Sequence, residues 1–334
     1  MVQTVFVTGG SGFVGGWCIV TLLRRGYDVR ATLRSLSKAD AVRAMVATQV
    51  DPGDRLTFAQ ADLMSDAGWD AAMAGIDHVL HVASPLGGEG QSVAALVGPA
   101  RDGTIRVLAA ATRAGVKRIV VTSSCAAATP LDQSGESVSD ETTWTDAEDP
   151  KLNAYRKSKA IAEWAAWDWM EANDDPARLT TILPAAIFGP VLSREAMSSV
   201  ALIQGLLNGR PPAVPRVSFN VVDVRDVAEA HVLALTTPEA AGQRFIAAGE
   251  FLWMKDVAAI LRDGLGAKAG KVPRRIMPDV LVRLIAIFVP PMRALTPIIG
   301  RRHSFDGRKA GQLLGLQYRP ARDTILDCAR SLGA

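Results

Sequence analysis

A strand that runs directly into a glycine-rich turn and then into a helix opens the chain, and it restricts the fold more than any other feature. The apolar run Thr4–Thr8 is followed by glycines at 9, 12 and 15 and by helical spacing over 13–25. In such a unit one glycine makes the tight turn, another lets the backbone approach a pyrophosphate, and Gly15 lets the helix pack on the sheet. The N–H groups of the helix N-terminus then face the anion. A glycine-rich loop without a ligand is the alternative, but its place between the first strand and a helix favours phosphate binding.

The rest of the first 190 residues alternates between apolar β-branched runs and longer segments with helical spacing. Strands separated by helices imply a parallel sheet that is covered on both faces. We therefore expect an α/β fold, a Rossmann-type doubly wound parallel sheet. Its further strands are expected at 28–33, 56–61, 78–82, 118–122 and 179–183, and its further helices at 39–48, 68–73, 93–114 and 153–172.

The pattern loosens after about residue 190. A turn is expected at Gly209-Arg210-Pro211-Pro212, and a helix over 223–235 with Asp223 as a possible cap. From Phe251 onward the spacing is helical and is interrupted by prolines. These features predict a nucleotide-binding Rossmann domain over 1–190 and a smaller, mostly helical substrate-binding lobe over 191–334, with the two parts interleaved.

Composition excludes several classes of protein. The 334 residues are 49% hydrophobic and 21% charged with a net charge of +3, so nothing in the bulk composition suggests a nucleic-acid partner. Three scattered cysteines indicate reduced thiols and a cytoplasmic location. The apolar run 280–289 contains Arg283 and is far shorter than the roughly 20 residues of a membrane span. We expect no membrane partner, with an amphipathic surface contact of this run as the alternative.

The end of the second expected strand indicates which nucleotide is bound. A cofactor with a free 2′-hydroxyl usually meets an Asp or Glu there. Here Arg34 occupies that place, and Lys38 follows one turn later. A guanidinium suits a 2′-phosphate, by bidentate hydrogen bonding or by stacking on adenine. We therefore predict NADP(H) as the cofactor, with a plain surface arginine as the alternative.

A second group of residues, Tyr155, Lys159 and Ser124, contains the candidate catalytic side chains. Tyr155 and Lys159 are four residues apart on an expected helix and so lie on one face. An ammonium close to a phenol favours the phenolate and lowers the phenol pKa. Ser124 follows the strand 118–122, and ligands bind beyond the carboxyl ends of strands in such a sheet. Each of these residues is weak evidence by itself, and a surface helix or a satisfied strand end would explain it.

The order of these motifs resembles that of the extended short-chain dehydrogenases/reductases. Within them the chain looks like the group of dihydroflavonol reductases, cinnamoyl-CoA reductases and bacterial aldehyde/ketone reductases. The likeness extends from residue 2 to about 235, with a weaker echo near the C-terminus. It rests on G-x-x-G-x-x-G, Asp62-Leu63, Val82-Ala83-Ser84-Pro85, Thr122-Ser123-Ser124, Tyr155-x-x-Ser158-Lys159-x-x-Ala162-Glu163 and Pro184-x-x-x-x-Gly189-Pro190.

The resemblance implies a role for each of these residues. Tyr155 would be the proton donor, Lys159 would tune it and bind ribose, and Ser124 would orient the carbonyl. The pyrophosphate would lie against the glycine loop, the adenine between Asp62 and Leu63, and the nicotinamide near Pro184. The full set of expected cofactor residues is Gly9, Ser11, Gly12, Phe13, Val14, Arg34, Lys38, Asp62, Leu63, Val82, Ala83, Ser84, Thr122, Tyr155, Lys159, Pro184, Ile187 and Ser199.

These roles predict an NADPH-dependent reduction of a ketone or aldehyde, reversible as an alcohol dehydrogenase. Departures from the family pattern bear on the substrate. Only the Asn, Tyr and Lys of the cinnamoyl-CoA reductase motif around the catalytic pair survive here, and small apolar residues at 125–128 follow Ser124. This lining favours an apolar or aromatic small-molecule substrate over a polyhydroxylated ring. The family implies a monomer or a homodimer.

Two other functions are alternatives to a carbonyl reductase, and a metal site is not expected. One alternative is a nucleotide-sugar epimerase or dehydratase of the same fold, against which Arg34 and the absence of Asp-Glu after Ser124 argue. The other is a non-catalytic regulator that senses NADP, against which the Tyr155/Lys159 pair argues. His78 and His81 are three apart on an expected strand and so point to opposite faces, which disfavours a shared metal.

Overall fold

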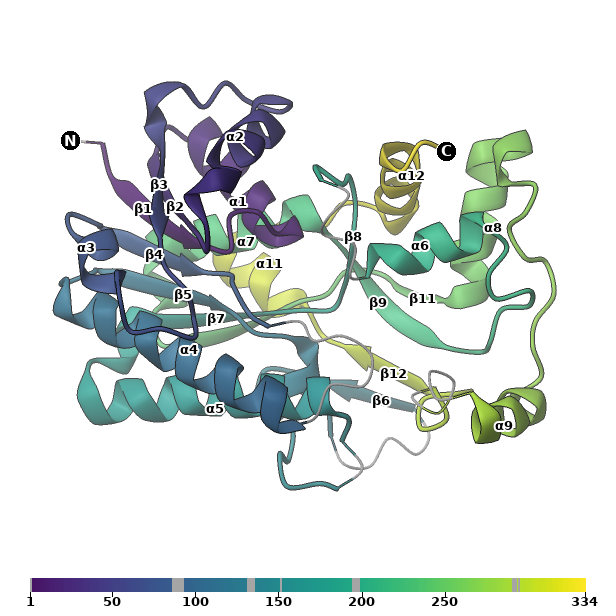
Figure 1. The fold of residues 1–334 in the computed structure, drawn as a ribbon. Coiled ribbons are helices and arrows are strands. Elements are labelled where there is room, and N and C mark those ends of the chain that lie inside the picture. Colours follow the sequence, from purple (N-terminus) through teal and green to yellow (C-terminus); the bar gives the residue numbers. More distant parts are fainter. Residues whose placement is uncertain are drawn as a thin grey trace.

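A seven-stranded sheet forms the centre of the molecule (Figure 1). The computed structural model describes residues 2–85, 93–130, 136–150, 152–193, 199–289, 293 and 295–334. The sheet order is β10-β7-β5-β4-β1-β2-β3, and every pair is parallel. The six predicted strands are present, and their ends differ from the prediction by at most one residue. The six are β1 (Thr4–Thr8), β2 (Asp28–Leu33), β3 (Leu56–Gln60), β4 (His78–His81), β5 (Arg118–Thr122) and β7 (Leu179–Pro184). The seventh strand of the sheet, β10 (Gln243–Ala247), was not predicted.

Helices cover both faces of this sheet, as the predicted fold class requires. One face is covered by α1 (Phe13–Arg24), α2 (Ala39–Ala47) and α7 (Val224–Thr236), whose apolar side chains share a core with β1 and β2. The other is covered by α3 (Trp69–Met73), α4 (Val93–Arg113) and α5 (Ala154–Asn173). Asp223 caps α7 by accepting a hydrogen bond from the Arg225 N–H. The doubly wound α/β fold is therefore confirmed.

The C-terminal half contains short strands that sequence reasoning missed. A second sheet has the order β11-β9-β8, built from Phe251–Trp253, Ser218–Asp223 and Ala186–Phe188. A third pairs β12 (Arg302–Phe305) in parallel with β6 (Glu136–Ser139). The expectation of purely helical spacing from Phe251 onward was wrong at β11 and β12, because strands this short are too brief to show a period of two.

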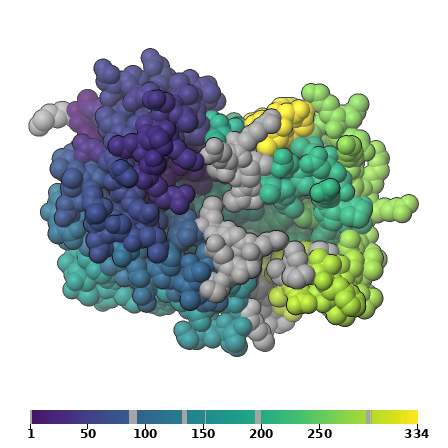
Figure 2. All heavy atoms as spheres, in the orientation of Figure 1, coloured from purple at the N-terminus to yellow at the C-terminus, as the bar shows by residue number. Residues whose placement is uncertain are grey.

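Most of the remaining helices pack around the second sheet, and one packs on the main sheet. The first group is α6 (Val200–Leu207), α8 (Met254–Leu265), α9 (Asp279–Phe288) and α12 (Ala321–Ser331), whereas α11 (Arg308–Leu314) shares the core of α7 and β10. Side chains of α6, α8 and α12 form a separate core with Phe188 and Val221. Figure 2 shows the N-terminal residues on one side of this face and the C-terminal lobe on the other. The division at residue 190 stays a prediction, and β10 joins the main sheet from within the later segment. Among the described helices, none has the length and apolarity to cross a bilayer.

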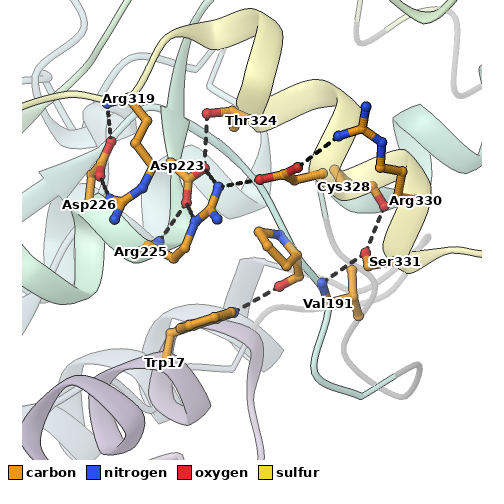
Figure 3. A network of polar contacts seen from close by, with 12 residues as sticks. Trp17, Val191, Asp223, Arg225, Asp226, Arg319, Thr324, Cys328, Arg330 and Ser331 are labelled. Carbon is orange, nitrogen blue, oxygen red and sulfur yellow. Dashed lines mark hydrogen bonds and ion pairs between the residues drawn. The ribbon is translucent and has the colours of Figure 1, made fainter. Parts of the chain in front are cut away.

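A polar network joins the end of β9 to the C-terminal helix (Figure 3). The carboxylate of Asp223 has no exposed surface, pairs with the guanidinium of Arg225, and accepts a hydrogen bond of 2.9 Å from Thr324 Oγ1 on α12. Arg225 also binds Asp327 at 2.9 Å. The buried carboxylate of Asp223 and the partly buried guanidinium of Arg225 thereby neutralise each other where the two halves of the chain meet.

The same region fixes the segment that follows β8. Trp17 Nε1 on α1 donates to the carbonyl of Pro190 at 2.8 Å. The N–H of Val191 donates to Ser331 Oγ on α12 at 3.0 Å (Figure 3). The first and last helices of the chain therefore hold this segment from two sides.

We predict that Asp223→Ala lowers the free energy of unfolding by about 3 kcal/mol, because it removes the helix cap and leaves Arg225 without its buried partner. Asp327→Ala, which removes a partly exposed partner of the same guanidinium, should cost less than about 1 kcal/mol. Urea unfolding followed by tryptophan fluorescence compares the two variants. Equal losses would show that Asp223 is not the central residue of the network.

Candidate active site

A cleft of about 1300 Å³ opens at the carboxyl ends of β1, β2, β4, β5 and β7. The glycine loop forms one wall, and the start of α5 forms another. With one exception, every residue predicted for the site lines this cleft. They are Gly9, Ser11, Gly12, Phe13, Val14, Arg34, Asp62, Leu63, Val82, Ala83, Ser84, Thr122, Ser124, Tyr155, Lys159, Pro184, Ile187 and Ser199. The exception is Lys38, which lies at the start of α2 outside the described lining.

The glycine loop is shaped by close backbone contacts. Gly9 has a φ of +73°, and a Cβ there would lie 3.0 Å from the backbone of Ala83. A Cβ on Gly15 would collide with the carbonyl oxygen of Gly9. Only glycine therefore fits at either position, which agrees with a tight turn that brings the helix start against the strand.

The loop leaves hydrogen-bond donors facing the cleft. The N–H of Gly12 is used by the carbonyl of Gly9 at 2.9 Å, and Gly12 has no side chain to cap α1. Helix geometry leaves the next N–H groups, those of Phe13 and Val14, without intrahelical acceptors. Both residues line the cleft, so these donors and the helix dipole suit a pyrophosphate.

Arg34 lies at the other side of this loop, at the end of β2. It is exposed and lines the cleft, so its guanidinium is available to a phosphate. Asp62 and Leu63 follow β3 and line the same end. Arg106 donates to the carbonyl of Leu63 at 2.7 Å, and Leu63 packs against Gly103 of α4.

The three candidate catalytic residues come from two elements. Ser124 follows β5 in an extended conformation, and its Oγ accepts a hydrogen bond of 3.1 Å from the Ala126 N–H. This contact occupies an acceptor site and leaves the hydroxyl proton for another partner. Asn153 caps α5 by accepting from the Arg156 N–H at 2.8 Å, which places Tyr155 and Lys159 in the first two turns.

The electrostatics of the pair differ from the expectation. Burial is the largest effect on Tyr155 and raises its pKa, while a hydrogen bond with Ser124 opposes this. Lys159 lies 5.9 Å from the centroid of the Tyr155 ring, and burial lowers the pKa of Lys159 to about 8. Partial burial of the phenol therefore opposes the expected lowering of its pKa by Lys159, and Tyr155 keeps its proton at neutral pH.

Behind the catalytic helix lies a buried ion pair that sequence reasoning missed. Arg244 Nε on β10 binds Glu163 Oε1 on α5 at 2.9 Å, and the two side chains are 8% and 0% exposed. The Glu163 carboxylate also accepts hydrogen bonds from the hydroxyl of Ser123 at 2.6 Å and from the hydroxyl of Thr181 at 2.8 Å. Glu163 belongs to the motif that begins at Tyr155, but its partner Arg244 lies 81 residues further along the chain, on a strand that the sequence did not predict.

Arg244 uses its remaining donors on the loop before α5. Its guanidinium donates to the carbonyls of Glu141 and Thr143 at 2.6 and 2.9 Å, and stacks on the Trp144 ring at 3.5 Å. Trp144 in turn packs on Trp164 of α5 at 4.1 Å. Trp164 is 39% exposed in this stack.

The substrate end of the cleft is less apolar than expected. Cys125 and Ala126 line it, whereas Ala127 and Ala128 are fully buried and do not. The C-terminal lobe, where the sequence pattern is least regular, contributes Phe219, Asn220 and Phe305 to the lining. Helix α5 contributes Arg156. Cys125 donates to the carbonyl of Leu183 at 3.2 Å, and burial raises its thiol pKa, so it remains a neutral lining residue.

Two buried histidines, His81 and His231, bind threonine hydroxyls at the strand ends. His81 Nδ1 pairs with Thr8 Oγ1 at 2.8 Å, and Thr8 also accepts from the N–H groups of Val82 and Ala83. His231 Nε2 pairs with Thr122 Oγ1 at 2.7 Å. Burial lowers the pKa of His81 to about 3, so the ring next to Lys159 is uncharged. These contacts fix the strand ends that carry the cleft.

Comparisons with known proteins agree with this geometry. The profile of the NAD dependent epimerase/dehydratase family matches residues 5–248. Cinnamoyl-CoA reductase 1 from Petunia hybrida is 37% identical over 333 residues, 99% of this chain and 92% of the relative. Anthocyanidin reductase from Vitis vinifera is 34% identical over 258 residues, 72% of this chain and 75% of the relative. The yeast methylglyoxal/isovaleraldehyde reductase, solved with NADPH, superposes with a TM-score of 0.83 at 26% identity, covering 99% of this chain and 98% of that one.

Proposed function

The chain belongs to the NAD dependent epimerase/dehydratase family, within the extended short-chain dehydrogenases/reductases, and is an NADP-dependent oxidoreductase; we propose that it reduces the carbonyl group of a small ketone or aldehyde to an alcohol. The observation that carries this proposal is the meeting of the glycine loop, Arg34, Ser124, Tyr155 and Lys159 in one cleft. The named relatives support reduction over the epimerase alternative, and the complete catalytic trio supports an enzyme over a sensor.

The residues present fit NADPH along the whole cleft. The free N–H groups of Phe13 and Val14 would hold the pyrophosphate, and Arg34 would bind the 2′-phosphate. Pro184 and Ile187 line the opposite end, beside the catalytic residues. Ser199 also lines this end and donates to the carbonyl of Ile187, so its role is to brace the backbone there. NADPH, when bound, supplies the hydride to the carbonyl carbon.

Three side chains would stabilise the charge that develops on the substrate oxygen and supply the proton to it. Ser124 and Tyr155 donate hydrogen bonds to the carbonyl oxygen, where negative charge develops during the reaction. Tyr155 passes its phenolic proton to that oxygen as general acid. Burial keeps this proton on the phenol beforehand, so the acid is ready in its required form.

Lys159 acts through its charge. The ammonium is buried on the same helix face as Tyr155, where it favours the phenolate that proton transfer leaves behind. It would also donate to the ribose hydroxyls of a bound nucleotide. Because burial lowers its pKa to about 8, this charge is present at neutral pH and lost in mild alkali.

Tyr155→Phe should lower kcat about a hundredfold or more, because the general acid is removed while the ring remains. The Kd for NADPH should change little. Tyr27→Phe is the matched control, since Tyr27 packs on the core away from the cleft lining. NADPH oxidation with a panel of ketones and aldehydes measures the effect, and a loss of less than tenfold would contradict the role of Tyr155.

Arg34→Ala should weaken NADPH binding about tenfold or more and leave NADH binding nearly unchanged, because only the 2′-phosphate loses a charge-assisted partner. Lys38→Ala should have a smaller effect, since Lys38 lies outside the cleft lining. Titration of nucleotide fluorescence gives the affinities of the wild type and of both variants for NADPH and NADH. An unchanged ratio of NADPH to NADH affinity in Arg34→Ala would refute this cofactor contact.

Turnover in the reductive direction should be flat from pH 6 to about 7.5 and should fall as the pH rises through the Lys159 pKa of about 8. The sign follows from the lowered pKa: the ammonium is present below this value and absent above it. Tyr155 has a raised pKa and keeps its proton through this range. In Lys159→Met the turnover should be low and this alkaline decline should be missing. A decline at the same pH in that variant would assign it to another group.

A further inference from the structure

The substrate end of the cleft contains a cation that the reaction does not use. Arg156 is the residue after Tyr155, is half-buried, and lines the cleft. Its backbone N–H binds Asn153, but within the part of the chain that the structure describes its guanidinium has no hydrogen-bond or carboxylate partner. Burial lowers the Arg156 pKa, yet an arginine remains charged at any physiological pH. A desolvated charge without a partner is costly, so its place in a cleft calls for a ligand.

The other charged groups of the cleft point to the sign of that ligand. Among the described lining residues the cations are Arg34, Arg156 and Lys159, and the carboxylate is that of Asp62. Asp62 follows β3, at the end of the cleft assigned to adenosine, and Arg34 and Lys159 are assigned to the nucleotide. His303 lies close enough to Arg156 for that charge to lower its pKa further, and it is therefore neutral. No described lining residue at the substrate end opposes the Arg156 charge.

The surroundings of Arg156 define the rest of the ligand. Phe219 and Phe305 line the same end and offer apolar surface, while Thr129 and Asn220 are uncharged. Asn220 is already used, since its side chain binds the carbonyl of Gly249 at 2.8 Å and the N–H of Phe305 at 3.0 Å. Arg156 also lies in the first turn of α5, where the helix dipole adds to its positive charge. The site combines one anion-binding group with an apolar wall.

We propose that Arg156 binds an oxyanion group of the substrate, so that the preferred substrates are carbonyl compounds with an apolar body and a carboxylate or phosphate beyond the carbonyl. The guanidinium fork matches either anion in a bidentate manner. This inference rests on the proposed function, because it assumes that the carbonyl lies at Tyr155, and it replaces the purely apolar substrate expected from residues 125–128.

The test compares substrates that differ only in charge. Benzoylformate and 4-oxo-4-phenylbutanoate are each paired with their methyl esters, and glyceraldehyde 3-phosphate is paired with glyceraldehyde. In the wild-type enzyme we expect kcat/KM for at least one anion to exceed that for its neutral partner tenfold or more. The acid pairs and the phosphate pair distinguish the two sources of the oxyanion.

Arg156→Gln should reduce this anion-to-neutral ratio at least tenfold, through a higher KM for the anion and not through kcat. Arg156→Lys should restore part of the ratio, because the charge returns without the planar fork. Lys157→Gln is the matched control: it removes a cation from the next position of the same helix, outside the described lining. Its ratio should equal that of the wild type.

The outcomes separate this inference from the proposed function. Reduction of the neutral partners with no preference for the anions, or equal losses on both in Arg156→Gln, would overturn the role of Arg156 alone. If no carbonyl compound is reduced, the proposed function fails, and direct binding then decides on the site. Calorimetry with phenylacetate and phenylacetamide in the presence of NADPH should show the anion binding more tightly, and an equal affinity would remove the subsite as well.

Discussion

The ion pair between Glu163 and Arg244 is the interaction on which the catalytic geometry depends. It joins α5 to β10, and the same carboxylate accepts hydrogen bonds from the hydroxyls of Ser123, which follows β5, and of Thr181, which lies within β7. A buried pair gains little over an apolar contact, but removing one partner leaves an uncompensated charge in the core. The helix that carries Tyr155 and Lys159 is therefore held in one register against the strand end that carries Ser124. A sub-ångström arrangement of reacting groups needs such a support.

Burial sets the chemistry of the cleft as much as charge does. It raises the pKa of Tyr155 and lowers that of Lys159, so both groups move toward their neutral forms. The phenol thus keeps its proton, and the pKa of the lysine falls to about 8. Arg156 cannot respond in this way because a guanidinium does not lose its proton in a protein. For the same environment we propose a reactive role for the tyrosine and the lysine and a binding role for the arginine.

The parts of this molecule that could be predicted are those whose information is local. The glycine loop, six of the seven main-sheet strands and the i, i+4 spacing of Tyr155 and Lys159 each depend on neighbours in sequence, and the structure places them as expected. The strands that the sequence did not predict, β6 and β8 to β12, are defined by pairing with segments distant in the chain. Residues such as Arg244, Phe219 and Phe305 reach the site only through that pairing. No periodicity in the sequence marks them, and the same holds for Arg156, whose burial depends on the lobe that folds over it.

The position of β10 and α12 in the chain has a consequence for synthesis. A ribosome delivers the nucleotide-binding half first, yet the edge of β7 finds its partner only when residues 243–247 emerge. The segment after β8 is clamped only when Ser331 arrives. Until then the nascent chain exposes an apolar, unpaired strand edge, which is the kind of surface that promotes misassembly. The main sheet can therefore be completed only after synthesis has passed residue 247 in the C-terminal half of the chain.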